Sequence, residues 1–210
     1  MHYTLTLWFG LKFKKTCRGE CGLVIFADDF IATFQYKDDA ERFLAAVTDR
    51  FATVGLELEP EKTRLVEFGR FAEETRSKRG EGKPDTFDFL GFTHYCSKSR
   101  KGWFRVKRKT ARKKFRTKLT EMNLWIKQNR HLRLKDLTDQ LNLKLIGHFR
   151  YYGITDNSEC IHLFLYETRK MLFKWLNRRS QRPSYSWDGF DEMMRHFPLA
   201  RPRIYCNIYS

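Results

Sequence analysis

The spacing of apolar residues changes near Lys107, and this change constrains the fold more than any other feature of the chain. Before it, apolar residues come in short runs of strand length, separated by segments rich in glycine, proline or charge. After it, they recur three or four residues apart, which is the period of an amphipathic helix. The helical stripes are Phe115–Ile126, Leu134–Tyr152 and Ile161–Leu176. We therefore predict an α+β segment over residues 1–106, a three-helix bundle over 107–182, and an irregular tail over 183–210 packed on the bundle.

Two β-rich runs, Leu23–Ala27 and Phe30–Phe34, flank a pair of acidic residues. This pattern predicts a β-hairpin with Asp28 and Asp29 at or beside its turn, where aspartate side chains bond readily to nearby backbone. A helix is predicted from Asp38 onward, ending at Gly55. Three further segments are then predicted: a strand over 62–68, an exposed loop over 76–84, and a strand over 87–95 whose hairpin partner is 103–106.

The whole chain has a formal net charge of +16, and the excess of positive charge lies entirely in its second half. Residues 1–96 hold 14 lysines and arginines against 16 acidic residues, whereas residues 97–210 hold 27 against 9, so the halves carry −2 and +18. A surplus this large is typical of a protein that binds a polyanion, above all a nucleic acid. Because 41% of the residues are hydrophobic and 16% aromatic, the composition is that of a folded chain.

Two groups of basic residues are the candidate RNA-binding surface. The first is predicted on the first helix of the bundle, and the second follows the third helix, near Trp175, Tyr185 and Trp187. Basic side chains neutralise phosphates, and exposed aromatic rings stack on unpaired bases. The alternatives are that the charges form an ordinary solvated face and that the aromatic residues belong to the core. The predicted RNA-binding residues are Lys107, Arg108, Lys109, Arg112, Lys113, Lys114, Arg116, Lys118, Arg178, Arg179 and Arg182.

Adjacent carboxylates at a hairpin turn suit Mg²⁺, which prefers hard oxygen ligands and keeps several waters. Two such ions, ~4 Å apart, stabilise the attacking and leaving oxygens in phosphoryl transfer. Asp28 and Asp29 are therefore candidate metal ligands. The alternative is that they only serve the turn or form an exposed acidic tip. Their seat between two apolar runs favours the metal, because unpaired charge beside a core is costly.

The five cysteines are odd in number and scattered, and no second pair follows Cys17 and Cys21 at the spacing of a zinc site. We expect reduced thiols in a cytoplasmic protein. Because no signal peptide or run of membrane-spanning length is visible, a membrane is not expected among the partners.

Five sequence blocks, in the right order, resemble those of group II intron reverse transcriptases, which also act as maturases. Phe26-Ala27-Asp28-Asp29 is similar to the Y-A-D-D box of that family, with phenylalanine in place of the usual tyrosine. The other blocks, which resemble the next motif, the primer-grip hairpin and two parts of the maturase (thumb) domain, are Gly55–Leu58 with Glu61–Arg64, Phe87–Phe92, Gly147–Gly153 and Lys174–Gln181. Together they span Leu23–Gln181, nearly the whole chain.

The resemblance implies a partial polymerase palm over 1–106 and a thumb over 107–182. The implied parent activities are RNA-templated DNA synthesis with Mg²⁺ and binding of group II intron RNA to promote splicing, with an RNA/DNA template-primer in the complete enzyme. Asp28 would be the metal-binding carboxylate and Asp29 its neighbour. The implied nucleotide and primer contacts are Phe26 and Ala27 at the incoming nucleotide, Lys62 near its phosphates, and Phe89, Leu90 and Gly91 at the primer end.

The family has fingers and the first half of the palm, with another catalytic aspartate, before its Y-A-D-D box. Only 25 residues precede Phe26, and Glu20 is the one acid among them. We therefore expect a truncated portion that binds RNA without polymerising alone, and that uses Mg²⁺ only when the active site is completed. Besides a truncated reading frame with no function at all, two alternatives stay open. One is the C-terminal half of a split reverse transcriptase, docked to a separate N-terminal half through the apolar opening His2–Phe9. The other is a non-enzymatic RNA-binding remnant.

Overall fold

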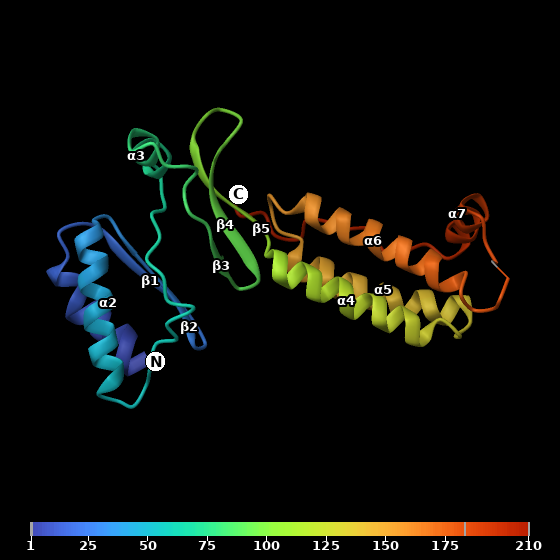
Figure 1. Ribbon diagram of the computed structural model, residues 1–210, viewed down its shortest axis with the longest axis horizontal. Coiled ribbons are helices and arrows are strands. Elements are labelled where there is room, and N and C mark those ends of the chain that lie inside the picture. Colours follow the sequence, from blue (N-terminus) through green and yellow to red (C-terminus); the bar gives the residue numbers. More distant parts are fainter. Residues whose placement is uncertain (1, 183, 210) are drawn as a thin grey trace. The chain divides into compact units, whose positions relative to one another are not determined.

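The computed structural model describes residues 2–182 and 184–209, which form two compact units with their boundary between Val66 and Glu67. Each unit is built around its own cluster of buried hydrophobic side chains. Figure 1 traces the elements of both units in chain order. The architecture is α+β, as predicted, with small antiparallel sheets and a helical second part.

The first unit packs a helix against one face of a two-stranded antiparallel hairpin. This arrangement confirms the predicted hairpin and the helix after it. The helix follows from its apolar stripe, and Gly55, with a φ of +68°, lies just beyond its end. In chain order the elements are a π-helical turn (His2–Leu7), α1 (Trp8–Leu11), a 3₁₀ turn (Phe13–Thr16), β1 (Cys21–Phe26), β2 (Asp29–Phe34) and α2 (Lys37–Ala52).

Aromatic rings dominate the core of the first unit. Phe43, on the buried face of α2, meets the rings of Phe13 and Phe34 at centroid distances of 5.2 Å each. A buried carboxylate, Asp39, accepts a hydrogen bond from the backbone N–H of Arg18 at 3.0 Å and pairs with the guanidinium of Arg42. Asp39 therefore fastens the segment before β1 to the start of α2, a role the sequence did not reveal.

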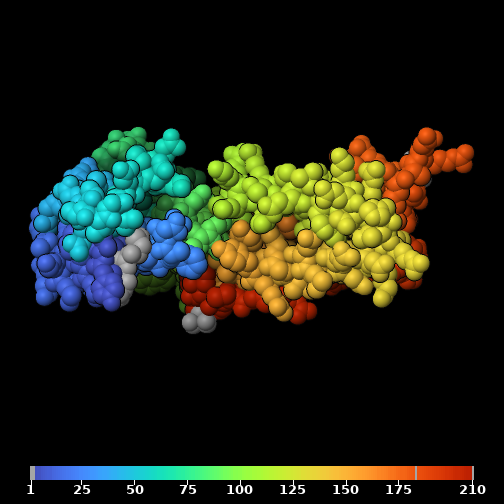
Figure 2. Space-filling model, turned by 90° about the horizontal axis from the view of Figure 1, so that it is seen from below, coloured from blue at the N-terminus to red at the C-terminus, as the bar shows by residue number. Residues whose placement is uncertain are grey.

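The second unit joins a three-stranded sheet, in the order β3-β4-β5, to a bundle of three long helices. The bundle confirms the three predicted helical stripes, whose members Ile126, Leu141 and Leu172 are fully buried. In the bundle α4 packs along α6, and Figure 2 shows the surfaces of α4 and α5 on one side of it. The elements are α3 (Ala72–Lys78), β3 (Phe87–Phe89), β4 (Phe92–Lys98), β5 (Phe104–Thr110), α4 (Arg112–Asn129), α5 (Leu134–Tyr152), α6 (Ser158–Leu176) and α7 (Trp187–His196).

A buried asparagine connects the sheet to the bundle. Asn157 immediately precedes α6, but its side chain does not cap that helix. Its carboxamide oxygen instead accepts from the backbone N–H of Thr110 at 2.7 Å, and its nitrogen donates to the carbonyl of Tyr152 at 2.8 Å. One fully buried side chain thus satisfies the end of β5 and the end of α5 together.

The C-terminal segment contains a helix where we predicted irregular structure. Ser186 caps α7 by accepting from the backbone N–H of Gly189 at 3.2 Å, a start signal hidden among prolines and aromatic residues. The predicted packing on the bundle is present, because Phe190 and Met193 are buried in the bundle core. Near the C-terminal end, the hydroxyl of Tyr209 donates a hydrogen bond to the carboxylate of Asp156 at 2.5 Å.

One prediction between α2 and the sheet is wrong, and a second, the exposed loop at 76–84, holds only for residues 79–84. Residues 62–68 do not form a strand: Lys62 and Thr63 belong to a turn closed on the Glu59 carbonyl, and Leu65 stays 49% exposed. An apolar pattern alone does not make a strand, because a strand also needs an edge to pair with. The predicted loop at 76–84 begins inside α3, whose acidic first turn and basic last turn suit the helix dipole.

Two further predictions placed residues in the wrong element. The run Phe87–Tyr95 is two strands, because the chain reverses at Leu90 and Gly91, whose φ angles of +49° and +78° are those of a two-residue hairpin turn. The hairpin to residues 103–106 is confirmed, but β5 continues to Thr110. Lys107, Arg108 and Lys109 therefore lie on a strand and not on the first helix of the bundle.

Candidate nucleic-acid interface

The acidic pair lies at the tip of the β1–β2 hairpin. Phe26 and Asp29 are directly paired across the strands, so Ala27 and Asp28 form a two-residue turn. Ala27 has a φ of +55°, a left-handed conformation that hairpin turns of this length require. The acids lie at the turn, as predicted, but both carboxylates are exposed, so the expected cost of unpaired charge beside the core does not arise.

The alternation of the strands separates a core face from an outward face. Leu23, Ile25 and Phe30 pack against the core of the first unit. Val24 and Phe26 point the other way and are 56% and 59% exposed. Because cross-strand partners share a face, the Phe26 ring lies beside Asp29. The tip therefore offers an aromatic surface next to two oxygen donors.

The donor set at this tip suits part of a divalent-metal site. Exposed carboxylates are the hard oxygen ligands that Mg²⁺ prefers, and this ion retains several waters of its own. In the described part of the chain neither acid has an ion-pair partner, and no group of three metal-ligating side chains is present. Lys62, the predicted phosphate contact, is exposed in the turn after α2.

The predicted primer-contact residues Phe89, Leu90 and Gly91 lie in the second unit, at the turn between β3 and β4. Tyr151, near the end of α5, donates a hydrogen bond from its hydroxyl to the Leu90 carbonyl at 2.8 Å. A Cβ on Gly91 would lie 3.2 Å from the Tyr152 hydroxyl, so the turn sits tightly on this helix end. Sequence reasoning did not identify the contact, although both tyrosines belong to the Gly147–Gly153 block.

The first predicted basic group is divided between β5 and α4. Lys107 and Lys109 are on one face of the strand and Arg108 is on the other, where its charge adds to burial in lowering the pKa of His94. On α4 the basic side chains are all exposed, and the first turn holds no acid. Lys118 is paired with Glu121 at 2.7 Å. The exposed members on α4 are Arg112, Lys113, Lys114, Arg116 and Lys118.

The second predicted group does not form one surface with its aromatic neighbours. Trp175 is 8% exposed and belongs to the core, so its ring is not a platform for bases. Arg178 lies over that ring at 5.5 Å, whereas Arg179 donates to the Leu132 carbonyl at 3.0 Å and has its pKa lowered by burial. Arg182 is exposed, and Trp187 stacks on Phe173 at 3.8 Å.

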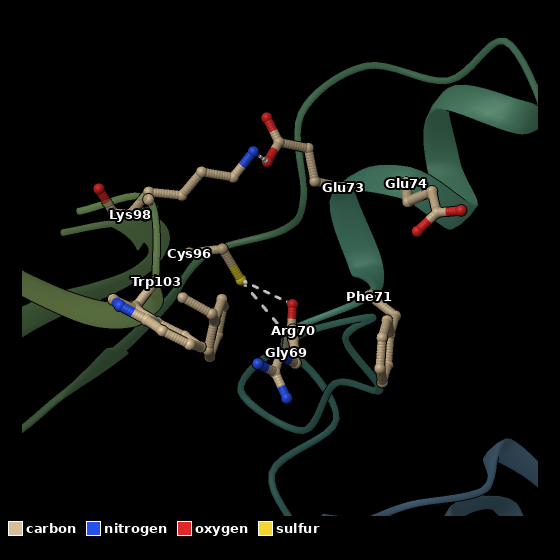
Figure 3. Close-up of a pocket in the computed structure, with 11 residues that line it drawn as sticks. Gly69, Arg70, Phe71, Glu73, Glu74, Cys96, Lys98 and Trp103 are labelled. Atoms are coloured by element: carbon tan, nitrogen blue, oxygen red, sulfur yellow. Dashed lines mark hydrogen bonds and ion pairs between the residues drawn. The ribbon is translucent and has the colours of Figure 1, made fainter. Parts of the chain in front are cut away.

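A shallow hollow of about 230 Å³ lies between the start of α3 and the β4–β5 hairpin, shown in Figure 3. The Cys96 thiol is hydrogen-bonded to Gly69 on its floor, and Lys98 reaches Glu73 at 3.2 Å. Phe71 and Trp103 are its exposed rings. None of the predicted site residues lines the hollow, and its Glu74 pairs with Lys78 of α3 at 2.7 Å.

An acid-tipped hairpin beside an exposed ring, a second hairpin with a tight glycine turn, and a strongly basic helical bundle together define a protein that handles nucleic acids. Residues 6–94 match the family model "Reverse transcriptase (RNA-dependent DNA polymerase)", and residues 112–191 match "Group II intron, maturase-specific domain". The chain therefore belongs to the group II intron-encoded reverse transcriptase/maturase family, as the sequence blocks indicated. Comparison with curated proteins gives no match. Among the described residues, no helix is both long and apolar enough to cross a membrane.

Proposed function

We propose that this chain binds structured group II intron RNA through its basic helical bundle. The observation that carries the proposal is the exposed basic face of α4, which begins at the first turn of the helix. A helix N-terminus bears a partial positive charge, so cations there are unfavourable by roughly 0.3–1 kcal/mol each at low salt. Arg112, Lys113 and Lys114 all occupy that unfavourable position. Bound phosphates would reverse the sign of the effect, because they interact favourably with both the helix end and the side chains.

The experiment measures binding of the purified chain to a folded group II intron RNA as a function of salt concentration. Replacing Arg112, Lys113 and Lys114 by glutamine should weaken binding and lower the slope of log K against log salt, by about 0.7–0.9 for each phosphate that the variant no longer neutralises. The matched control replaces Lys12, Lys14 and Lys15 by glutamine, which removes the same charge from exposed positions in the first unit. Absence of RNA binding at moderate ionic strength would refute the proposal.

Asp28 and Asp29 are, in the same proposal, ligands for Mg²⁺ in a palm active site that needs a further carboxylate. The family uses divalent metal in general. A bound metal would stabilise charge on the reacting phosphate oxygens. The chain's own residues would hold it through the two carboxylates, place the Phe26 ring and Ala27 backbone beside the nucleotide, and set Lys62 toward its phosphates. The turn at Phe89, Leu90 and Gly91 would support the primer end.

Primer extension on an RNA template tests the acidic site. We expect the chain alone to bind the template-primer and to extend it poorly. Extension by the purified chain that Asp28→Asn abolishes would show that the site is complete within these residues. If Asp28→Asn changes neither extension nor Mg²⁺-dependent binding of the template-primer, the pair has no role in metal chemistry and the chain acts only as an RNA-binding protein.

A second candidate function is polymerisation together with a separately encoded N-terminal half. Leu5 and Phe9 of the opening segment, which was expected to dock, are buried in the core of the first unit. The outward hairpin face favours the candidate instead, because Val24 and Phe26 expose apolar surface next to the acids. Co-purification with the product of a neighbouring reading frame, and extension that appears only in the mixture, would support this candidate. The variant Val24→Asp should prevent association and leave RNA binding by the bundle unchanged.

A further inference from the structure

Trp175 is held between two helices of the bundle. It lies in the last turn of α6, and its indole N–H donates to the side-chain oxygen of Asn123 on α4 at 2.8 Å. The ring is 8% exposed. An indole locked in this way cannot swing out to stack on a base, but its electron-rich face can attract cations.

Four basic side chains lie over this one ring, and they are called the Trp175 cluster below. Two come from the last turn of α4 or just beyond it, and two from the last turn of α6 or just beyond it. The distances from their charged groups to the ring centroid are 5.6 Å for Lys127, 5.3 Å for Arg130, 5.3 Å for Lys174 and 5.5 Å for Arg178.

The charges of the Trp175 cluster are close together and unbalanced. Since each lies within 5.6 Å of the same point, no two can be farther apart than about 11 Å, which is close to the screening length of roughly 8–10 Å. Within residues 2–182 and 184–209, none of the four forms an ion pair with an acidic side chain, whereas other cations of the bundle, such as Lys118 and Arg169, do. The cluster therefore repels itself.

The fold compensates only part of that repulsion. The C-terminal ends of α4 and α6 each present about half a negative charge, which together offset roughly one of the four positive charges. The indole ring contributes attraction but no net charge. An excess of about three positive charges therefore remains at one end of the bundle. The Asn123–Trp175 hydrogen bond fixes the ring over which these charges lie.

We infer that the Trp175 cluster binds the sugar–phosphate backbone of RNA, with neighbouring phosphates taking the place of the missing acidic partners. The inference rests on the proposed RNA-binding function and assigns part of it to a site distinct from the α4 N-terminal turn. The cluster binds phosphate groups and does not stack on bases, because its one aromatic ring is buried and covered by cations. Lys127, Arg130 and Lys174 were not among the residues expected from the sequence to bind RNA.

The test replaces Lys127, Arg130, Lys174 and Arg178 by glutamine and measures RNA affinity over a range of salt concentrations. We expect weaker binding, equally so for a group II intron RNA and for an unrelated folded RNA, and a slope of log K against log salt that falls by about 3. The control replaces Lys12, Lys14, Lys15 and Lys101, four exposed lysines elsewhere, and should change the slope by less than one. Circular dichroism verifies that both variants fold.

The indole N–H resonance of Trp175 gives a second readout, with inorganic tripolyphosphate as the probe. It should shift on titration of the unmodified chain and stay unchanged in the glutamine variant. If the unmodified chain binds RNA but the variant keeps its slope and the resonance does not shift, the inference is wrong while the proposed function stands. If the unmodified chain binds no RNA but the resonance shifts with tripolyphosphate, the proposed function is wrong and the cluster is an anion site without an RNA role.

Discussion

The hydroxyl of Tyr151 donates a hydrogen bond to the carbonyl of Leu90 at 2.8 Å, across 61 residues of sequence. This bond joins the turn of the β3–β4 hairpin to the end of α5, and the ring of Tyr151 also stacks on Phe92 at 5.9 Å. A second bond, from the Ala111 N–H to the Gly91 carbonyl at 2.9 Å, fixes the other residue of the turn. The hairpin is therefore fastened to the bundle, although the reverse transcriptase match ends at residue 94 and the maturase match begins at 112.

Tyr151→Phe should loosen this turn without unfolding the unit. Loss of one hydrogen bond at a partly solvated site should lower the free energy of unfolding by about 0.5–1.5 kcal/mol. Hydrogen exchange of the Gly91 and Phe92 amides should become faster, because the turn opens more often. Tyr166→Phe is the control, since Tyr166 is similarly exposed. Equal exchange in both variants would show that the Tyr151 bond does not hold the turn.

Gly91→Ala tests how tightly the turn fits the helix end. The φ of +78° already disfavours a side chain, and the new Cβ would lie 3.2 Å from the Tyr152 hydroxyl. Gly102→Ala is a matched control, because its φ is +81° but a Cβ there would meet nothing within 4 Å. Both variants should lose roughly 1 kcal/mol through backbone strain. In urea unfolding, Gly91→Ala should lower the free energy of unfolding by more than Gly102→Ala does. Equal decreases would mean that the Tyr152 side chain moves away from the new Cβ at no measurable cost.

The sequence predicted the elements whose signals are local. Alternation and helical spacing are set by neighbouring residues, so the acid-tipped hairpin, α2 and the three bundle helices were all found. The turn at Leu90 and Gly91 was missed because it interrupts a run of aromatic residues without the usual asparagine or aspartate before the glycine. The strand predicted at 62–68 is wrong for the opposite reason. Its local apolar pattern suits a strand, but it pairs with no neighbouring strand.

Features that depend on packing between distant segments were beyond such reasoning. Lys127 and Lys174 are 47 residues apart and meet only because α4 and α6 pack together. Their spacing from Arg130 and Arg178, three and four residues, is the kind of signal that places cations on one helix face. This spacing does not show that the cations of two helices lie over the same aromatic ring, that of Trp175. The same limit applies to Asn157, whose position suggests a helix cap until the fold brings Thr110 beside it.

Asn157→Ala should be among the most damaging single changes in the second unit. The side chain is fully buried and is bonded to the Thr110 N–H and the Tyr152 carbonyl. Removing it leaves the buried Thr110 N–H unsatisfied and takes one of two donors from the Tyr152 carbonyl, which keeps the Ile154 N–H at 2.9 Å. We therefore expect a loss of about 2–3 kcal/mol in the free energy of unfolding. Asn129→Ala, which breaks one partly buried bond to the Trp125 carbonyl, should cost about 1 kcal/mol. Similar losses in urea unfolding for the two variants would contradict the connecting role of Asn157.

His148 should make the second unit sensitive to acid. Burial, aided by the charge of Lys118, lowers the pKa of His148 to about 4, and its Nε2 is buried without a hydrogen-bond partner. The unfolded chain takes up a proton below its ordinary value of 6.5, but the folded chain does so only near 4. The stabilising contribution is therefore full above pH 6.5 and is lost as the pH falls toward 4, by on the order of 3 kcal/mol in total.

His148→Phe removes the titrating group and keeps a ring that can stack on Phe164, as the imidazole does at 3.6 Å. The difference in unfolding free energy between pH 7 and pH 5, measured with urea, should be about 2 kcal/mol smaller for this variant than for the unmodified chain. His162→Gln, at an exposed position on α6, should leave that difference unchanged. If His148→Phe keeps the full pH dependence, the acid sensitivity comes from carboxylates elsewhere, and the buried imidazole is protonated at little cost because the bundle opens locally around it.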